Sequence, residues 1–361
     1  MTITFTRPRI EGAASWRGAL AVCLLLTAAA LPAQAQTDCG DNPWVAGWAP
    51  AWTPIFQGID WAGACTTRLP TNPATPGIRT QKVNILRIDL QASGIQLFTT
   101  PQSGAAETTG QVASEFICSY GVQVAVNANF FSPCCHDEPT PPSPNQMSLC
   151  GFEVSNGQTV SSPAAGACAA GAAALLVTKD NQASIQVMTD LAKPPAGVYN
   201  AVAGSPQPSA GACPQTVPGP LLLVLDGVNS SCPETDANPP EKVAARTAVG
   251  LSPGGRTLYL LTVDGTDGSS SGAGFFDAAQ WLIQLGADRG INLDGGGSTV
   301  MAMQQPGGEG VQILNSPNQA CCQRYVGAFL GVRANPLQTP FVPPGCGTRA
   351  CSQPAASCPG L

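Results

Sequence analysis

Ile291-Asn292-Leu293-Asp294-Gly295-Gly296-Gly297-Ser298-Thr299 is the stretch of sequence that constrains the fold most strongly. It begins as a short apolar strand and runs directly into an aspartate, three glycines and a hydroxyl pair. Such a strand end places polar groups at the rim of a sheet, where glycine lets the backbone approach closely. Three consecutive glycines cost backbone entropy that an ordinary turn does not require. The stretch therefore predicts a functional turn at the end of a buried strand.

Three further stretches also join polar residues to buried strands. They are Val126-Asn127-Ala128-Asn129-Phe130-Phe131, Ala245-Arg246-Thr247-Ala248-Val249-Gly250 and Val263-Asp264-Gly265. Each one alone has an ordinary interpretation, and Asp264-Gly265 by itself indicates only a turn. The four stretches are informative as an ordered set.

That ordered set resembles the motifs of the phosphodiester glycosidase family. The segment from Gly286 to Thr299 is similar to the family's hallmark, and the Arg246 and Asp264 stretches are similar to two further motifs. Asn127-Ala128-Asn129-Phe130-Phe131 resembles the family's Asn-Gly-Gly-Phe-Phe element, with Ala-Asn in place of the paired glycines. Asn315, Arg324 and Val326 resemble its closing segment. The resemblance covers residues 80–333.

The resemblance implies hydrolysis of the bond between a sugar anomeric carbon and a phosphodiester. Glycoside hydrolysis typically uses two carboxylates, for which Asp264 and Asp294 are the candidates. Asn127 and Asn292 are expected to hold sugar hydroxyls or the reacting water. Arg246 or Arg324 is expected to clamp the phosphate, beside an anion-binding concavity of backbone amides. The predicted substrate-binding set is completed by Gly295, Gly296, Gly297, Ser298, Thr247, Asn129 and Asp277, the last standing where many family members carry Glu.

Other chemistries fit the sequence less well. A Ser-His-Asp mechanism would have to use His136, the chain's one histidine, and Ser298 lies in no nucleophile-elbow motif. Cys134-Cys135-His136-Asp137-Glu138 suits a disulfide-stapled loop better than a structural metal. We expect no cofactor, and a divalent cation held by Asp264 and Asp294 is an alternative that no ligand spacing supports. Cleavage of the phosphate–oxygen bond, or a non-catalytic carbohydrate- or envelope-binding protein on the same fold, remain the alternative functions.

The N-terminus has the pattern of a secretory signal peptide. Arg7, Arg9 and Arg17 precede the apolar run Gly18–Leu31, and Ala33-Gln34-Ala35 reads as a cleavage site. Cleavage would take the formal charge from −6 to −8, because three Arg and one Glu are removed. An acidic chain of this kind is not expected to bind nucleic acid. We expect a secreted or periplasmic protein with no membrane span after cleavage, and the sequence predicts no oligomeric state.

Cysteine usage agrees with export. Fourteen of the 15 cysteines follow the signal peptide, and an even number in an exported chain favours disulfides. The predicted fold is α+β, with a mixed, strongly twisted sheet, few helices and long disulfide-stapled loops. The expected divisions are a signal peptide over 1–35, an irregular N-terminal wrap held by Cys39 and Cys65 over 36–80, a glycosidase-like domain over 81–335, and a Cys- and Pro-rich tail over 336–361.

Local patterns predict the elements. Trp44, Trp48, Trp52 and Trp61 are expected to pack on the core, with stacking on sugar rings as the alternative. A long stapled insertion is expected over 132–170. The apolar periodicities predict two hairpins, two helices and further short strands. The hairpins are Val83–Leu90 with Ile95–Phe98 and Arg246–Leu251 with Thr257–Val263; the helices are Thr108–Tyr120 and Phe275–Leu285; the other strands are Val122–Val126, 173–178, 184–188, Leu221–Leu225, 289–293, 299–303, 311–314 and 325–333.

Overall fold

The strands of this protein pair antiparallel throughout the described part of the chain. A computed structural model describes residues 48–66, 80–105, 107–134, 136–137, 146–162, 173–188, 195–204, 222–231, 243–265, 270–317 and 322–351. These residues contain 24 strands and two α-helices. The expected mixed sheet is therefore wrong, and the fold is mostly β. Parallel pairs need long crossover connections, and two helices offer few of them.

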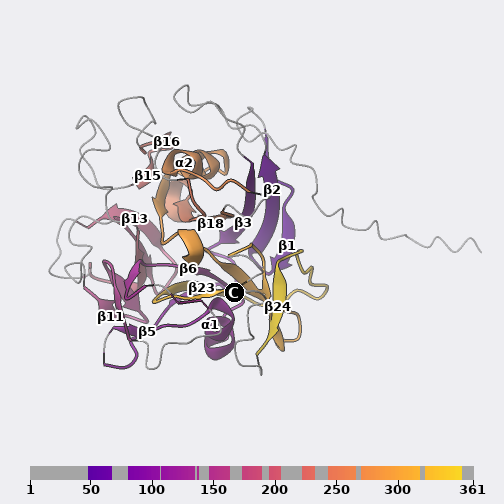
Figure 1. Cartoon of the computed structure of the whole chain (residues 1–361). Coiled ribbons are helices and arrows are strands. Elements are labelled where there is room, and N and C mark those ends of the chain that lie inside the picture. The colour runs from indigo at the N-terminus through magenta and orange to yellow at the C-terminus, as the bar shows by residue number, and fades with distance from the viewer. Residues whose placement is uncertain are drawn as a thin grey trace, which may run out of the picture. The chain divides into compact units, whose positions relative to one another are not determined.

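The largest sheet has eight strands in the order β1-β2-β3-β18-β17-β19-β15-β16. One of its faces is covered by α2 (Phe275–Gln284), whose Trp281 and Leu282 are fully buried against β17 and β18. In Figure 1, α2 lies beside β15 and β16. The strands are β1 (Thr53–Phe56), β2 (Ile59–Thr66), β3 (Gln81–Asp89), β15 (Leu222–Leu225), β16 (Val228–Asn229), β17 (Arg246–Leu251), β18 (Thr257–Val263) and β19 (Arg289–Asn292).

A second sheet has six strands in the order β24-β21-β20-β6-β23-β4. Helix α1 (Ala113–Tyr120) packs on it, and Phe116 stacks on Phe329 with ring centroids 4.9 Å apart. Figure 1 shows α1 next to β6 and β23. A disulfide joins Cys118 of α1 to Cys351, directly after β24. The strands are β4 (Gln96–Thr99), β6 (Val124–Asn127), β20 (Met301–Gln304), β21 (Gly310–Ile313), β23 (Phe329–Arg333) and β24 (Gly347–Ala350).

Smaller sheets flank these two. A five-stranded sheet runs β11-β10-β14-β12-β13, and two short ribbons run β5-β9-β7 and β22-β8. The strands are β5 (Thr108–Thr109), β7 (Phe131–Ser132), β8 (His136–Asp137), β9 (Gln146–Leu149), β10 (Glu153–Ser155), β11 (Gln158–Ser161), β12 (Ala173–Thr178), β13 (Ala183–Val187), β14 (Val198–Ala203) and β22 (Arg324–Tyr325); the short 3₁₀ turns are η1 (Pro253–Gly255) and η2 (Gly296–Ser298).

One continuous apolar cluster joins the two large sheets. Val249 and Ile291 of the eight-stranded sheet belong to the same buried cluster as Val126 and Leu330 of the six-stranded sheet. At about 25 cal/mol per Å² of buried apolar area, such a shared core is the main term holding the sheets together. The polar residues at the ends of these strands are thereby held near one another.

Several predicted elements are confirmed, and the Arg246–Leu251 and Thr257–Val263 hairpin has the expected bounds. The hairpin predicted for Val83–Leu90 and Ile95–Phe98 is wrong, because both edges of β3 are occupied by β2 and β18 and β4 pairs with β23 instead. Helix α1 starts at Ala113, after the expected start at Thr108, and Thr108 and Thr109 form β5 instead.

Segments expected to be irregular also contain strands. The expected N-terminal wrap supplies β1 and β2, the insertion over 132–170 supplies β8 to β11, and the tail supplies β24. Among the tryptophans, Trp48 packs on Trp281, Trp61 on Phe341, and Trp52 lies under Arg87, as expected for packing; Trp44 lies outside the described residues.

Disulfides are confirmed as a feature of the fold. Besides the Cys118–Cys351 bridge, five described cysteines are disulfide-bonded: Cys65, Cys134, Cys150, Cys322 and Cys346. Cys39, which was expected to hold the N-terminal wrap together with Cys65, lies outside the described residues. Within the described residues, no helix is long and apolar enough to span a membrane.

Candidate active site

The ends of five strands meet at one edge of the molecule. β17 begins at Arg246, and its antiparallel neighbours β18 and β19 end beside it at Val263 and Asn292. In the second sheet, β6 ends at Asn127 and β20 begins beside it at Met301. Antiparallel neighbours necessarily bring the end of one strand to the start of the next. The stretches that the sequence analysis singled out are therefore brought together.

Asn127 connects the two sheets through its side-chain amide. Its Oδ1 accepts hydrogen bonds from Thr247 Oγ1 at 2.7 Å and from Val300 N at 3.0 Å. Its Nδ2 donates to the carbonyl oxygen of Asp294 at 2.6 Å. Both Asn127 and Thr247 are fully buried. The amide thus ties β6 to β17 and to both ends of the turn that follows β19.

Asp294 lies buried at the start of that turn, with 7% of its surface exposed. Its Oδ1 accepts from Gly295 N at 2.9 Å, and its own amide donates to Ala128 O at 2.9 Å. Burial raises the pKa of Asp294 from 3.8 to about 7, against the opposing effects of a hydrogen bond from Ser298, the Gly295 N–H and the Arg324 charge. A pKa near neutrality suits a group that takes up and releases protons.

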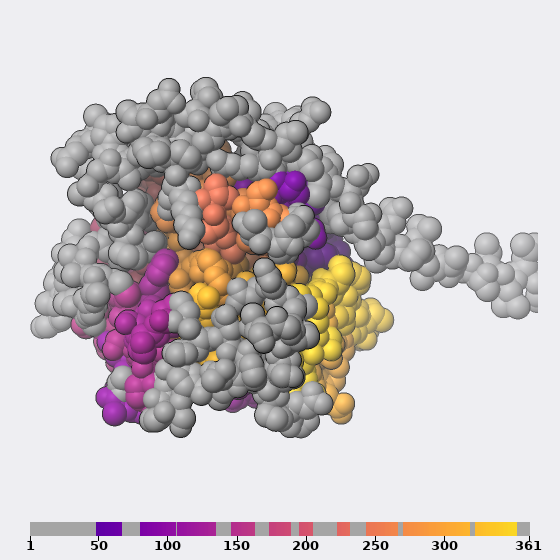
Figure 2. All heavy atoms as spheres, in the orientation of Figure 1, coloured from indigo at the N-terminus to yellow at the C-terminus, as the bar shows by residue number. Residues whose placement is uncertain are grey.

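The three glycines are required by close contacts and by one backbone conformation. Gly296 has a φ of +60°, a region that side chains disfavour. A Cβ at Gly297 would overlap the guanidinium of Arg324, and a Cβ at Gly295 would lie 2.8 Å from Ala245 O. The triplet therefore lets Arg324 and the Ala245 backbone close around the turn. All three glycines are partly exposed, and orange atoms from this part of the chain reach the visible surface near the middle of the face in Figure 2.

Two arginines flank the turn. Arg246 is 8% exposed, donates from Nε to Ala273 O at 2.9 Å, and lies over the Phe275 ring at 4.4 Å. Arg324, in β22, is partly exposed. The backbone of β22 pairs with β8 in a short ribbon, in which Arg324 lies opposite Asp137 in register. The insertion that was expected to be a loop therefore supports the strand that carries Arg324.

The sequence of this chain matches the family described as phosphodiester glycosidase over residues 120–333, which is more than half of the chain. The chain belongs to the phosphodiester glycosidase family. The match contains all five strand ends described above. Comparison with curated protein sequences gives no match.

A solved structure shares the fold of this chain. The catalytic domain of zebrafish N-acetylglucosamine-1-phosphodiester alpha-N-acetylglucosaminidase, described as auto-inhibited by its pro-peptide, is similar with a TM-score of 0.50 at 17% identity, over 78% of this chain and 84% of that one. A hypothetical protein from Synechocystis matches with a TM-score of 0.45 at 18% identity, over 78% of this chain and 64% of that one. At 17% identity, the likeness to the zebrafish domain shows the fold of this phosphodiester glycosidase alone.

Asp264 occupies the same edge in this phosphodiester glycosidase. It follows β18 and is buried, with Oδ1 accepting from Ser316 N at 3.0 Å. Its carbonyl accepts from Ser270 Oγ at 2.7 Å, and Gly265 packs closely against Ala245. The second predicted carboxylate is thus held on the strand neighbouring Arg246.

Two buried polar atoms at the site have no hydrogen-bond partner within the described residues: Asn292 Oδ1 and Thr299 Oγ1. Asn292 Nδ2 donates to Leu293 O at 2.5 Å, so the amide is held while its oxygen stays unpaired. Unpaired buried polar atoms are costly and are common where a ligand or water completes the site. Thr299 carried no distinct signal in the sequence beyond its place beside Ser298.

Two predicted binding residues bond within the protein. Asn129 Nδ2 donates to Cys150 O and Phe152 O, and its Oδ1 accepts from Ala203 N, all at 3.2 Å. Asp277 Oδ2 accepts from Gly274 N at 3.0 Å at the start of α2 and from Gln81 Nε2 at 3.1 Å. Asn129 thereby anchors the five-stranded sheet and Asp277 caps α2. No cluster of three or more metal-binding side chains occurs within the described ranges.

Proposed function

We propose that this protein is an exported hydrolase that cleaves the glycosidic bond of a sugar-1-phosphodiester. The observation that carries the proposal is Asp294, a buried carboxyl with a pKa of about 7 on a glycine turn flanked by two arginines. Family membership supports the reaction class. The disulfide-bonded cysteines support an oxidising compartment, in agreement with a cleaved signal peptide.

In the proposed reaction, Asp294 in its ionised form accepts a proton from the attacking water. The water oxygen bonds to the anomeric carbon, the bond from that carbon to the phosphodiester oxygen breaks, and a phosphate monoester leaves with the bonding electrons. Because this leaving group is more stable than a sugar alkoxide, no protonation of it by a second group is required. Asp264 is the second carboxylate of the site, and it stabilises positive charge that develops on the sugar.

Arg246 and Arg324 bind the phosphate in this proposal. Stacking over Phe275 and the bond to Ala273 O hold the Arg246 guanidinium in place, which reduces the entropy lost on binding an oxyanion. The amides of Gly295 and Gly296 donate to Asp294 Oδ1 and Ala245 O, so of the glycine amides we assign that of Gly297 to the phosphate. Asn292 Oδ1 and the Thr299 hydroxyl, both unpaired within the described residues, are proposed to meet a sugar hydroxyl or the reacting water.

The test is hydrolysis of UDP-N-acetylglucosamine and a panel of other sugar-1-phosphodiesters by the purified, oxidised mature protein. Release of free sugar that Asp294→Asn and Arg246→Ala both abolish would support the proposal. Asp226→Asn is the matched control, because Asp226 is an exposed carboxylate paired with Arg289 near the far end of β19. Circular dichroism would establish that each variant is folded.

Oxygen-18 water separates the two bonds that such a site can cleave. Label in the released sugar would support glycosidic cleavage, whereas label in the phosphate would replace it with phosphodiesterase action. If the protein binds sugar without hydrolysing it, and Asp294→Asn still binds, the protein would be a carbohydrate-binding protein with an enzyme's fold. Cell-envelope or exopolysaccharide glycans that contain sugar phosphates are the proposed natural substrates.

A further inference from the structure

The side chain of Asn127 has all its observed bonds within the protein. Its oxygen accepts two hydrogen bonds, from Thr247 Oγ1 and Val300 N, and its nitrogen donates to Asp294 O. The residue is fully buried, as is Thr247. Neither side chain is therefore available to a substrate, although both were expected to contact one.

The same amide fixes the two ends of the glycine turn. Asp294 O lies at the start of the turn and Val300 N at its end. The adjacent residue Ala128 accepts from Asp294 N, which adds a third bond from the same strand end. A turn clamped at both ends can hold the intervening backbone in the left-handed conformation that Gly296 adopts.

The N–H of Val300 and the carbonyl of Asp294 fix which way the Asn127 amide faces. Reversal of the amide would place an N–H group against Val300 N, where no acceptor is available. The Thr247 hydroxyl donates to Asn127 Oδ1 in this orientation and joins the amide to β17. The hydroxyl on the eight-stranded sheet thus helps to hold in place the amide that the six-stranded sheet presents to Asp294.

We infer that Asn127 and Thr247 are positioning residues that hold the Asp294 carboxyl in its buried place against the glycine turn without touching substrate. The consequence for turnover rests on the proposed function, while the hold on the Asp294 carboxyl does not. Through the hydrogen bond between them, the two residues link both large sheets to the backbone of Asp294. Conservative changes to either residue therefore alter how Asp294 titrates.

The molecule contains a matched control for this arrangement. Asn200 is also buried, its Oδ1 accepts from Thr99 Oγ1 and Asn156 N, and its Nδ2 donates to Leu97 O. The chemistry is the same, a threonine hydroxyl and an amide donating to one asparagine, but none of its partners belongs to the glycine turn. Asn200→Asp therefore reports the cost of disturbing such a network away from Asp294.

The test follows the carboxyl carbon of Asp294 by ¹³C NMR across pH in the mature oxidised protein, with Asp294→Asn identifying the resonance. Asn127→Asp puts an acceptor against the Asp294 carbonyl, and Thr247→Val removes the hydroxyl that joins the Asn127 amide to β17. Thr247→Val is expected to admit water and lower the pKa of Asp294 by about one unit, whereas the added carboxylate of Asn127→Asp is expected to raise that pKa. Both variants are expected to lower kcat roughly tenfold with KM changed less than about twofold. Thr247→Ser and Asn200→Asp are expected to leave the titration unchanged.

An unchanged Asp294 titration and kcat in folded Thr247→Val would overturn the inference, as would an equal shift in Asn200→Asp. If Asn127→Asp fails to fold, Thr247→Val and Thr247→Ser carry the test. If the wild-type protein hydrolyses no sugar-1-phosphodiester, the proposed function fails. A shifted titration in Thr247→Val that Thr247→Ser restores would still support positioning in that case.

Discussion

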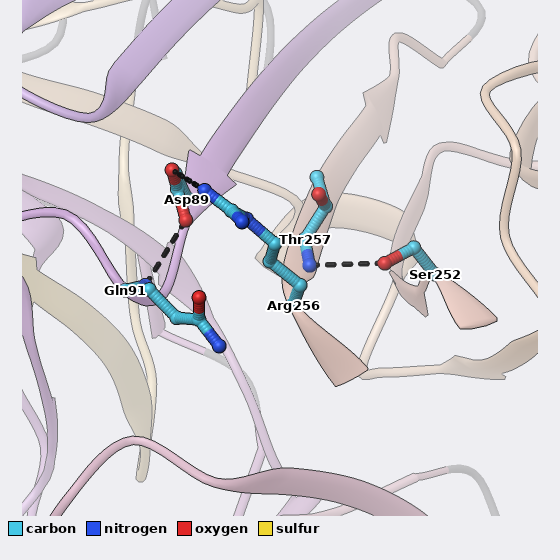
Figure 3. A network of polar contacts seen from close by, with 5 residues as sticks. All are labelled: Asp89, Gln91, Ser252, Arg256 and Thr257. Atoms are coloured by element: carbon cyan, nitrogen blue, oxygen red, sulfur yellow. Dashed lines mark hydrogen bonds and ion pairs between the residues drawn. The ribbon is translucent and has the colours of Figure 1, made fainter. Parts of the chain in front are cut away.

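At one end of β18, Asp89 accepts hydrogen bonds from Arg256 at 3.1 Å and from Gln91 N at 3.0 Å, in contact with solvent (Figure 3). Beyond the other end of β18, across Arg246, lies Asp294, buried at the glycine turn. Partial burial raises the pKa of Asp89, but hydrogen bonds from Arg256 and Gln91 and the Arg256 charge outweigh it, so its pKa lies below 3.8. The pKa of Asp294 instead rises to about 7.

The comparison teaches that the same residue type has a lowered pKa at one end of the sheet and a pKa near neutrality at the other. Asp89 keeps 39% of its side chain exposed, so water and a cation both favour the charged form. Asp294 has lost most of its water, and the groups that lower its pKa do not compensate for that loss. The ionised carboxylate is favoured at Asp89, and burial makes it unfavourable at Asp294.

Asp294→Asn is expected to have the largest effect. The amide cannot accept the proton from water, and loss of a general base costs about 10²–10⁴-fold in kcat. Asp89→Asn at the opposite end is expected to leave kcat/KM within about twofold, because an exposed ion pair contributes only about 0–1 kcal/mol to stability. Comparable activity of the two variants on a sugar-1-phosphodiester would remove the distinction between the two ends.

Removal of the arginine at each end should give the next largest difference. Arg246→Ala removes a held guanidinium, and a lost hydrogen bond to a charged group costs about 1.5–3 kcal/mol, roughly 10–150-fold in kcat/KM. Arg256, which is 62% exposed, is expected to give no measurable change when replaced by Ala. Inorganic phosphate should inhibit the wild type more strongly than Arg246→Ala. Equal inhibition constants would argue against a phosphate site at Arg246.

Glycine substitutions sharpen the comparison further. Gly297→Ala forces the guanidinium of Arg324 to move, which is expected to cost little stability because that guanidinium is the end of a flexible side chain, and to lower activity about tenfold. Gly254, in the hairpin turn of β17 and β18 at the Asp89 end, has a φ of +74° with open space around it. Gly254→Ala is expected to cost about 1–2 kcal/mol through backbone strain alone. Urea unfolding and kcat measured together would separate the two, since only Gly297→Ala should impair turnover.

The smallest expected difference between Asp294 and Asp89 is in how the stability that each contributes depends on pH. The raised pKa of Asp294 means that its ionisation opposes folding, so the stability it contributes is lost as pH rises from about 3.8 toward about 7. The lowered pKa of Asp89 means that its contribution is present above 3.8 and lost as pH falls below it. At pH 8, Asp294→Asn should therefore raise the urea midpoint and Asp89→Asn should lower it. Activity should rise with pH through about 7, and a profile flat from pH 5 to 9 would exclude Asp294 as the base.

The elements that sequence patterns predicted well are those whose partners are close along the chain. The β17–β18 hairpin follows from two apolar runs around a Pro-Gly-Gly turn. β3 was recognised as a strand, but its pairing with β18 joins residues more than 160 positions apart, which alternation cannot reveal. The sheet's antiparallel order depends on such distant pairings.

The candidate site divides in the same way. The residue types at Asp294 and Arg246 were informative because a buried strand rarely ends in aspartate and three glycines. The separate reasons for the glycines could not be predicted, because Arg324 reaches Gly297 only through the tertiary fold. Asn127 and Asn129 looked alike in sequence, yet one clamps the turn and the other anchors a different sheet. The roles of Asn127 and Asn129 depend on which elements lie beside each of them in the tertiary fold.

The disulfide between Cys118 and Cys351 can form only after nearly all of the described chain has been synthesised. Its cysteines are 233 positions apart, and β24, which precedes Cys351, closes the edge of the six-stranded sheet. A nascent chain that has delivered β6, the glycine turn and β20 still lacks the cysteine that secures α1. Proteolytic cleavage directly ahead of Cys351 would separate β24 from the disulfide, which would stay on α1, and would leave β6, β17, β18, β19 and β20 intact. The residue that follows β24 is thus bonded covalently to α1, a helix that lies more than 200 positions earlier in the sequence.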